Sequence, residues 1–338
     1  MALVLIEGFD HLTAAQLALK GWGVTAGVSS QSGRLGGQSV RTSNSTVSKT
    51  LPGSYSTVYV GFAIKVVNFD ITFIQGITNL RNGGTDVIRL KYGSASGNTV
   101  WAIYRGDGTT LLGTGTFPIT VNIWYYVEMK VVFSATVGSV ELRINGSATP
   151  DILVTGLNTG TTNVNAIALQ GGYGGYSDHD DVYVCDTSGS APTNNFLGDI
   201  RVQAIWPTGN GNSSSLVGSD SNSTDNYLLV DETTPDDNTT YVQSPTGTAK
   251  DTYVYGDLTP TSGTVYGIQI VPYAQKTDAG AKGIVSVARL STTEVDSSAH
   301  ALSTSYQFFP DISETKPGGG AWTIDDVNNA EFGVKVSA

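Results

Sequence analysis

The chain has 338 residues, a formal net charge of −11 at pH 7, 14% charged residues and 41 glycines. This length predicts two domains, because single cores stop growing at about 250–300 residues, and few charges with many glycines predict an all-β protein. An acidic surface repels phosphate backbones, so nucleic acid is excluded as an expected partner.

The first residues are expected to form a strand rather than a signal peptide. The apolar run in Met1–Leu12 has no basic residues before it, and Glu7 and Asp10 follow at once. Leu12–Lys20 predicts about two turns of helix, with Thr13 as a candidate N-cap and Gly21 as the stop. No run approaches the ~18 apolar residues of a membrane span, so we expect no membrane insertion.

Alternating or β-branched runs separated by turn residues predict short strands through the first 205 residues. The Asn145-Gly146 pair predicts a type I′ turn, since both positions need positive φ. Arg105-Gly106-Asp107 spells an integrin-type tripeptide at a predicted hairpin tip, where we attribute it to chance. The predicted strands are Thr57–Val66, Asp86–Tyr92, Val100–Tyr104, Trp124–Phe133, Ser139–Asn145, Ala166–Leu169 and Asp181–Cys185.

Residues 206–226 are almost all small and polar, which predicts a linker or long loop between domains 1–205 and 227–338. The charge is also uneven: 12 Lys and Arg stand against 13 Asp and Glu up to Ile205, and 6 against 16 from Trp206 onward. We therefore expect a second, smaller and acidic β-sandwich. Its predicted strands are Tyr253–Tyr255, Thr264–Tyr273, Ile284–Arg289, Ser305–Phe309 and Glu331–Val336.

Three segments of the first domain carry a family resemblance. Trp124–Lys130 (WYYVEMK) followed by Ser139–Ser147 (SVELRINGS) resembles the core hairpin of laminin-G and concanavalin-like domains, and Asp180–Asp186 (DDVYVCD) resembles their closing strand. Ile6–Asp10 is similar to their first strand. The resemblance implies an antiparallel jelly-roll sandwich over residues 1–205. Alternation also places Trp124, Tyr126 and Glu128 on one side of their strand.

The second domain carries another resemblance. Asp231–Tyr241, Ala274–Gly283 and Trp322–Val336 are similar to the C-terminal part of tailed-bacteriophage structural proteins, which often carry a concanavalin-like domain ahead of it. This resemblance implies a protein of the virion surface, made in the host cytoplasm without a signal peptide. The implied partners are other capsid or tail proteins and further copies of this chain.

Enzymatic motifs are absent from the sequence. Retaining glucanases of this fold present two carboxylates about 5–5.5 Å apart, usually from a Glu-x-Asp-x-x-Glu strand. The nearest match, Glu294-Val295-Asp296, lacks the second Glu, and Glu128 and Glu141 are expected on solvent faces. His11, His179 and His300 stand alone, without zinc-ligand spacing, and the single cysteine, Cys185, is expected to be buried. We expect no catalysis.

An acidic cluster offers a possible metal site. Asp178, Asp180 and Asp181 supply oxygen ligands of the kind that Ca²⁺ prefers, and concanavalin-like domains often hold calcium at a sandwich rim. The alternative is that these aspartates cap turns. We expect no required cofactor, with calcium as the one ion that this cluster could hold.

A glycine-rich loop offers a possible glycan site. Tyr173 and Tyr176 lie in the segment GGYGGY, where their rings could stack on the apolar face of a sugar. The alternative is that they pack against a neighbouring subunit.

The sequence therefore predicts a non-enzymatic structural protein on the surface of a tailed-phage virion, as a capsid decoration or tail-associated subunit, that could aid attachment to glycans. The first alternative is a carbohydrate-binding receptor of the phage tail. The second is a polysaccharide-degrading enzyme.

Overall fold

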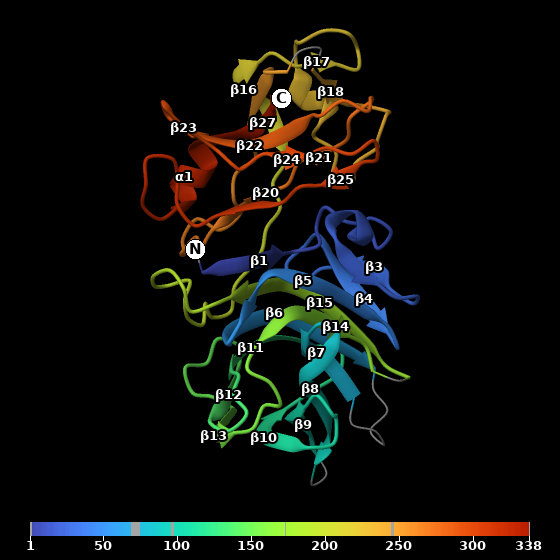
Figure 1. Ribbon diagram of the computed structural model, residues 1–338, viewed down its shortest axis with the longest axis vertical. Helices are drawn as coiled ribbons and strands as arrows, with labels where there is room; N and C mark the ends of the chain where they lie inside the picture. Colours follow the sequence, from blue (N-terminus) through green and yellow to red (C-terminus); the bar gives the residue numbers. More distant parts are fainter. Residues whose placement is uncertain (1, 69–74, 96–97, 173, 245–246, 338) are drawn as a thin grey trace. The chain divides into compact units, whose positions relative to one another are not determined.

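The computed structural model describes residues 2–68, 75–95, 98–172, 174–244 and 247–337. The chain divides into two compact units, Met1–Val202 and Gln203–Ala338. Figure 1 shows the elements of each unit coloured along the chain.

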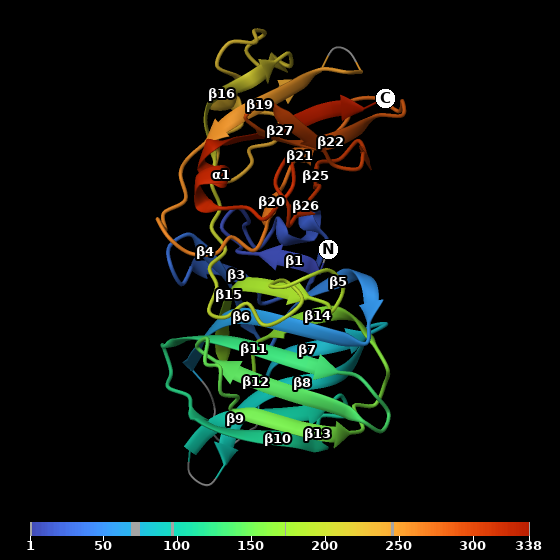
Figure 2. The same cartoon turned by 90° about the vertical axis from the view of Figure 1, so that its left-hand side faces the viewer.

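Unit 1 consists of two antiparallel sheets. The first runs in the order β13 (Ile152–Leu157), β12 (Gly138–Ile144), β11 (Trp124–Val132), β6 (Thr57–Asn68), β15 (Tyr176–Cys185), β4 (Gln38–Ser43) and β3 (Ser29–Ser32), and β1 (Leu3–Glu7) also pairs with β15. The second runs in the order β10 (Leu111–Pro118), β9 (Asn98–Arg105), β8 (Thr85–Ala95), β7 (Gln75–Asn82), β14 (Val164–Gln170), β5 (Thr46–Tyr55) and β2 (Trp22–Val24). Figure 2 shows β6, β11 and β12 side by side.

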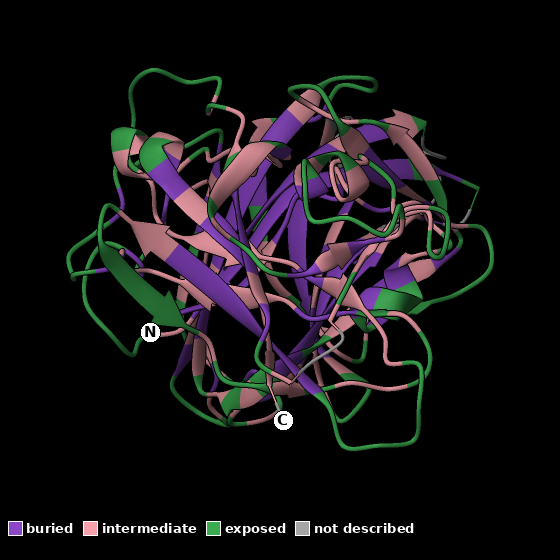
Figure 3. Cartoon of the chain, turned by 90° about the horizontal axis from the view of Figure 1, so that it is seen from above, coloured by how far each residue is buried: buried purple, intermediate pink, exposed green. Residues whose placement is uncertain are grey.

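The chain passes repeatedly between the two sheets, for example from β4 to β5 to β6 to β7, which gives the predicted jelly-roll sandwich. Alternate residues of β6, from Val58 through Phe62 to Val66, are fully buried between the sheets. Trp101 of one sheet meets Tyr125 of the other edge to face, with ring centroids 6.1 Å apart. Figure 3 shows mostly buried or half-buried strands and mostly exposed connections.

Two local predictions in unit 1 need adjustment. The expected helix shrinks to one 3₁₀ turn, η1 (Leu17–Lys20), which does end at Gly21 with φ 77°. Asn145 and Gly146 both have the predicted positive φ, 53° and 69°. They do not close a two-residue hairpin, because β13 begins only at Ile152 and the whole segment between them forms the connection.

Unit 2 is built on one main sheet with short ladders beside it. The main sheet runs in the order β16 (Pro207–Ser214), β19 (Lys250–Tyr255), β27 (Ala330–Ser337), β22 (Gly283–Leu290) and β23 (Thr293–Asp296), with β24 (His300–Ala301) also on β22. The ladders are β17 (Val217–Gly218) with β18 (Val242–Gln243), β20 (Ile268–Ile270) with β26 (Asp311–Ser313), and β21 (Tyr273–Ala274) with β25 (Gln307–Phe308). The helical elements are η2 (Asn226–Leu229) and α1 (Ile324–Asn329).

One face of the main sheet of unit 2 carries its core. Trp322 and Phe332 are buried there, and Ile268 and Ile270 of β20 pack against the same cluster. The helix α1 starts with a capping box between Thr323 and Asp326. The sheet and the β20–β26 ladder thus form two layers, and the all-β fold class is confirmed for the whole described chain.

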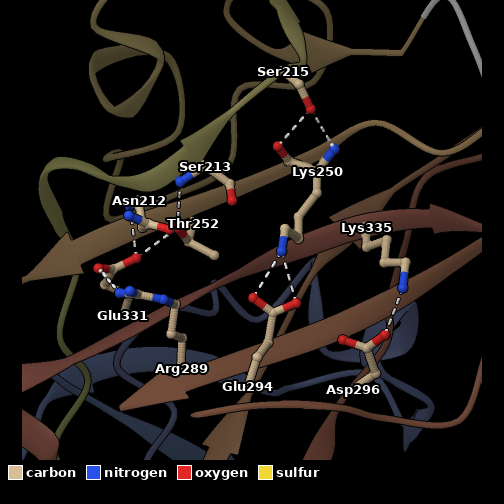
Figure 4. Close-up of polar contacts among 10 residues, drawn as sticks. All are labelled: Asn212, Ser213, Ser215, Lys250, Thr252, Arg289, Glu294, Asp296, Glu331 and Lys335. Atoms are coloured by element: carbon tan, nitrogen blue, oxygen red, sulfur yellow. Dashed lines mark hydrogen bonds and ion pairs between the residues drawn. The ribbon is translucent and has the colours of Figure 1, made fainter. Parts of the chain in front are cut away.

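The same sheet also carries three cations and three carboxylates that pair across its strands (Figure 4). Lys250 binds both carboxylate oxygens of Glu294 at 2.7 Å, and Lys335 binds Asp296 at 2.7 Å. A third pair, Arg289 with Glu331, is separated by 2.6 Å. The charges of this face therefore neutralise one another.

Residues 206–226, predicted as a linker or long loop, lie wholly inside unit 2, so they do not link two domains. Pro207–Ser214 forms the edge strand β16, whose backbone pairs with β19. Its small residues are needed for packing: a Cβ on Gly211 would lie 2.6 Å from the side chains of Glu331 and Thr252. Polar composition alone does not distinguish such an edge strand from a loop.

Candidate functional site

Four neighbouring strands of the first sheet place charged and aromatic side chains in one line on its outer face. Asp178 of β15 stands opposite Arg41 of β4 on one side and Lys65 of β6 on the other. Lys65 in turn stands opposite Trp124 of β11. Tyr176 lies two residues before Asp178 and therefore on the same face. We call these five side chains the aromatic–cation row.

A buried carboxylate holds the centre of the row. Asp178 is 0% exposed, and it accepts hydrogen bonds from Arg41 Nε at 2.6 Å and Arg41 Nη2 at 2.9 Å. Lys65 Nζ lies 3.0 Å from the same carboxylate. Hydrogen bonding to Asp178 raises the pKa of Arg41 above its ordinary value. Two cations on one carboxylate leave the row with a net charge of +1.

The two aromatic side chains each lie beside one of these cations. The Arg41 guanidinium carbon is 5.8 Å from the ring centroid of Tyr176, and Lys65 Nζ is 4.8 Å from that of Trp124. Tyr176 is 42% exposed and Trp124 is half-buried. Ile123, next to Trp124, is 49% exposed. The row therefore presents apolar ring surface together with positively charged hydrogen-bond donors. This combination is suited to binding sugars and aromatic or anionic groups.

Of the two predicted glycan-binding residues, one lies within the described residues. Tyr176 belongs to the row, whereas Tyr173 lies outside the described residues. The backbone N–H of Tyr176 donates to Asn68 Oδ1 at 2.8 Å, which fixes the start of β15 beside the end of β6.

The three predicted calcium ligands do not face one common site. Asp178 faces Arg41 and Lys65, whereas Asp180 and Asp181 lie at an irregularity of β15 and contact Arg34. Burial raises the pKa of both Asp180 and Asp181. Within the described ranges, no group of three His, Cys, Asp or Glu side chains is placed to hold a metal ion. Calcium binding stays a prediction.

Arg34 ties the closing strand to the end of unit 1. Its Nε donates to Asp181 Oδ2 at 2.9 Å, and its backbone N–H donates to Asp180 Oδ2 at 2.8 Å. The other Asp181 oxygen accepts from the backbone N–H of Val202 at 2.7 Å. Asp181 adopts φ 49° at the bulge of β15. The carboxylates of Asp180 and Asp181 therefore bind Arg34 and Val202 beside this bulge and hold the last residues of the unit against it.

The carboxylates weighed as catalytic groups are engaged by other residues. Glu128 is 1% exposed, not on a solvent face as expected, because its Oε1 accepts from Tyr183 Oη at 2.5 Å and from the Gly198 N–H at 2.8 Å. Glu141 pairs with Arg143 at 2.7 Å. Glu294 and Asp296 bind lysines in unit 2.

The comparisons with known proteins bear on the fold. No family model matches the sequence, and no curated protein matches it. The cellulose-induced protein Cip1 is 13% identical, with 53% of this chain and 96% of that chain covered and a TM-score of 0.40. Domain 4 of AbnA, an extracellular arabinanase from Geobacillus stearothermophilus solved with arabinotriose, is 15% identical over 55% and 92%, with a TM-score of 0.37.

A third similar structure is the catalytic domain of a GH131 β-glucanase from Podospora anserina. It is 13% identical over 57% of this chain and 99% of that chain, with a TM-score of 0.36. These similarities concern the fold alone. Within the described residues, no helix is long and apolar enough to span a bilayer.

Three members of the row were not predicted as residues of a surface site: Arg41, Lys65 and Trp124. Lys65 interrupts an otherwise apolar strand, which is a signal that its side chain faces outward. Arg41 carries no such signal. Its partner Asp178 lies 137 residues later in the chain, and the sequence does not show that their strands are neighbours in the sheet.

Proposed function

We propose that this chain is a non-enzymatic carbohydrate-binding protein and that the aromatic–cation row holds the glycan. The observation that carries the proposal is the pairing of two partly exposed rings with two cations around one buried carboxylate. Ring faces contact the C–H groups of a sugar, while guanidinium and ammonium groups donate to its hydroxyl or carboxylate oxygens. Asp178 holds both cations in place.

The dimensions of the row favour a chain of sugars over a single one. Trp124 and Arg41 stand on strands separated by three strand spacings, about 14 Å at about 4.8 Å each. An extended oligosaccharide crossing the strands would meet Trp124, then Lys65, then Arg41 with Tyr176 beside it. Tyr173, in the loop that precedes β15, stays a predicted contact.

The absence of catalysis is part of the proposal. A glycosidase needs a proton-donating carboxyl and a second carboxylate facing the scissile bond. In the row, Asp178 is enclosed by Arg41 and Lys65, and it is the central anchor of the surface rather than an open acid. This arrangement suits binding without turnover.

The first experiment is a screen of the purified full chain on a glycan array, followed by calorimetric titration of the best ligand. We expect saturable binding and no release of reducing ends from that polysaccharide on long incubation. Growth of reducing ends would contradict the non-enzymatic assignment. Failure to bind any glycan at millimolar concentration would contradict the carbohydrate-binding assignment.

A second candidate function is that of a structural subunit on the surface of a tailed-phage particle, with other virion proteins and copies of itself as partners. The supporting observation is that two segments resembling phage structural proteins meet in unit 2. Tyr273, adjacent to one, donates to Asp237 Oδ1 of the other at 2.7 Å. Mass spectrometry of purified particles tests this role, and finding the chain only in the unassembled fraction would contradict it.

A further inference from the structure

Three connections at one end of unit 1, with the strand ends beside them, border an open pocket of about 300 Å³. They are the β7–β8 turn with Asn82 and Asp86, the β9–β10 turn with Arg105 and Gly106, and the β13–β14 connection with Thr161. The pocket is separate from the aromatic–cation row. Strand β14 begins beside the pocket and ends shortly before Tyr176, and its seven residues span about 20 Å.

Arg105 lines the pocket and has hydrogen-bond donors beyond the one that it uses within the unit. Its Nε donates to the carbonyl oxygen of Asn158 at 3.1 Å, which holds the guanidinium over the β13–β14 connection. Its side chain also approaches Gly160, where a Cβ would lie 3.5 Å from Arg105 Cδ. In the described part of the chain, no hydrogen bond engages the two terminal guanidinium nitrogens. Arg105 therefore offers a planar pair of donors on a fixed side chain.

The two carboxylates near Arg105 are directed to other donors. Asp107 accepts from the backbone N–H groups of Thr109 and Thr110, each at 2.8 Å, and from Thr110 Oγ1 at 2.7 Å. These hydrogen bonds hold the pKa of Asp107 well below its usual range. Asp86 pairs with Arg81 at 2.6 Å and with Arg89 at 3.0 Å. Among the described residues, neither acid forms an ion pair with Arg105.

The lining of the pocket holds one cation, Arg105, and two carboxylates, Asp86 and Asp107. Three further cations, Arg81, Arg89 and Lys91, stand on the adjoining strands β7 and β8, so these turns and strands together carry +2, whereas the whole chain carries −11. Two of the cations, Arg89 and Lys91, also donate to carbonyl oxygens of Gly106 and Gly108, at 2.9 and 2.7 Å. Each residue of the Arg-Gly-Asp tripeptide thus makes hydrogen bonds within unit 1, and its Arg and Asp have different partners.

We propose that this pocket binds one sugar residue bearing a carboxylate or sulfate group, with Arg105 as its donor. Two parallel N–H···O bonds from a guanidinium to such a group are short and geometrically selective. Asn82 and Thr161 line the same space. Asn82 Nδ2 donates to Asn163 Oδ1 at 2.7 Å, so the Asn82 side chain is held in place beside the pocket. A volume of about 300 Å³ lies at the lower end of small-molecule pockets, which fits a single ring.

Titration of the isotope-labelled full chain with D-glucuronate, followed by NMR at the Gly106 and Gly160 amides and the Arg105 Nε–H, tests this site. Glucose and inorganic sulfate are the matched probes. We expect glucuronate to bind at least about tenfold more tightly than either. Equal binding of glucose would overturn the role of the charge, and equal binding of sulfate would overturn the role of the sugar. No shift at these signals with glucuronate would overturn the site.

Variants separate the pocket from general effects on the fold. We expect Arg105→Gln to weaken glucuronate at least about tenfold and Arg105→Lys to weaken it less, because a lysine keeps the charge but loses the paired donors. Arg143→Gln, at an arginine paired with Glu141 outside the pocket, is the matched control and should bind as the unaltered chain does. Wild-type affinity in Arg105→Gln would overturn the proposal. Trp124→Ala should leave this binding unchanged, so the pocket and the row are tested independently.

Discussion

His179 should make the stability of unit 1 depend on mildly acidic pH. The side chain is 0% exposed, its Nε2 lies 3.1 Å from the carbonyl oxygen of Gln170, and the ring of Phe62 is 6.1 Å away between centroids. Burial lowers the pKa of His179 from 6.5 to about 4. The folded state therefore holds the neutral imidazole at pH values where the unfolded chain becomes protonated.

The sign and size of the effect follow from this difference. Since the folded-state pKa is the lower one, the contribution of His179 to stability is complete above pH 6.5 and is lost as pH falls toward 4. A difference of 2.5 pH units corresponds to about 3 kcal/mol. In His179→Gln this loss should disappear, because a glutamine amide does not titrate. Burial, and then the positive charge of Lys20, also lower the pKa of His11 to about 4, so the test compares the variant with the unaltered chain.

Cys185 provides an assay that reports on unit 1 alone. It is the single cysteine of the chain, it is buried, and it lies on the same strand as His179. We would measure its labelling by an acid-compatible pyridyl disulfide at pH 7 and pH 4.5 in increasing urea, with rates normalised to the fully unfolded chain. His300→Gln, a histidine substitution in unit 2, is the control. The same loss of protection in His179→Gln as in the unaltered chain would refute the reasoning.

Three further predictions concern packing and buried polar groups. Gly61→Ala should destabilise unit 1 by about 1–3 kcal/mol, because the new Cβ would lie 2.0 Å from the ring of Tyr183, whereas Gly209→Ala, whose Cβ would have 4.0 Å of clearance, should melt as the unaltered chain does. Tyr183→Phe should cost about 1–3 kcal/mol in urea unfolding, since it removes the 2.5 Å donor to buried Glu128, and an unchanged midpoint would contradict this. Asp251→Asn should lower the melting temperature of unit 2, because this buried carboxylate accepts from four donors; an unchanged melting temperature would count against that network.

Strand patterning predicted the sandwich because alternation is a local property. Trp124, Tyr126 and Glu128 do share the outer face of β11, as their register opposite Lys65, Ala63 and Gly61 shows. What alternation could not show is which segments cover that face. Glu128 is buried because Gly198, 70 residues later, returns to cap it.

The candidate site was only partly accessible to sequence analysis for the same reason. Tyr176 and Asp178 were chosen from local composition, and both belong to the row. Their partners Arg41 and Lys65 depend on the order of strands in the sheet, which no local pattern encodes. Asp180 and Asp181 look equivalent to Asp178 in sequence, but the irregularity in β15 directs them to Arg34 instead.

The most direct test of carbohydrate binding at the row is calorimetric titration of the best array ligand into the Trp124→Ala/Tyr176→Ala double variant. Leu111→Ala, at a 51% exposed residue of the other sheet, is the matched control. Loss of two ring contacts predicts affinity at least about tenfold weaker in the double variant and unchanged affinity in the control. Full affinity in the double variant, with the fold intact, would contradict the assignment of the row as the glycan-binding site.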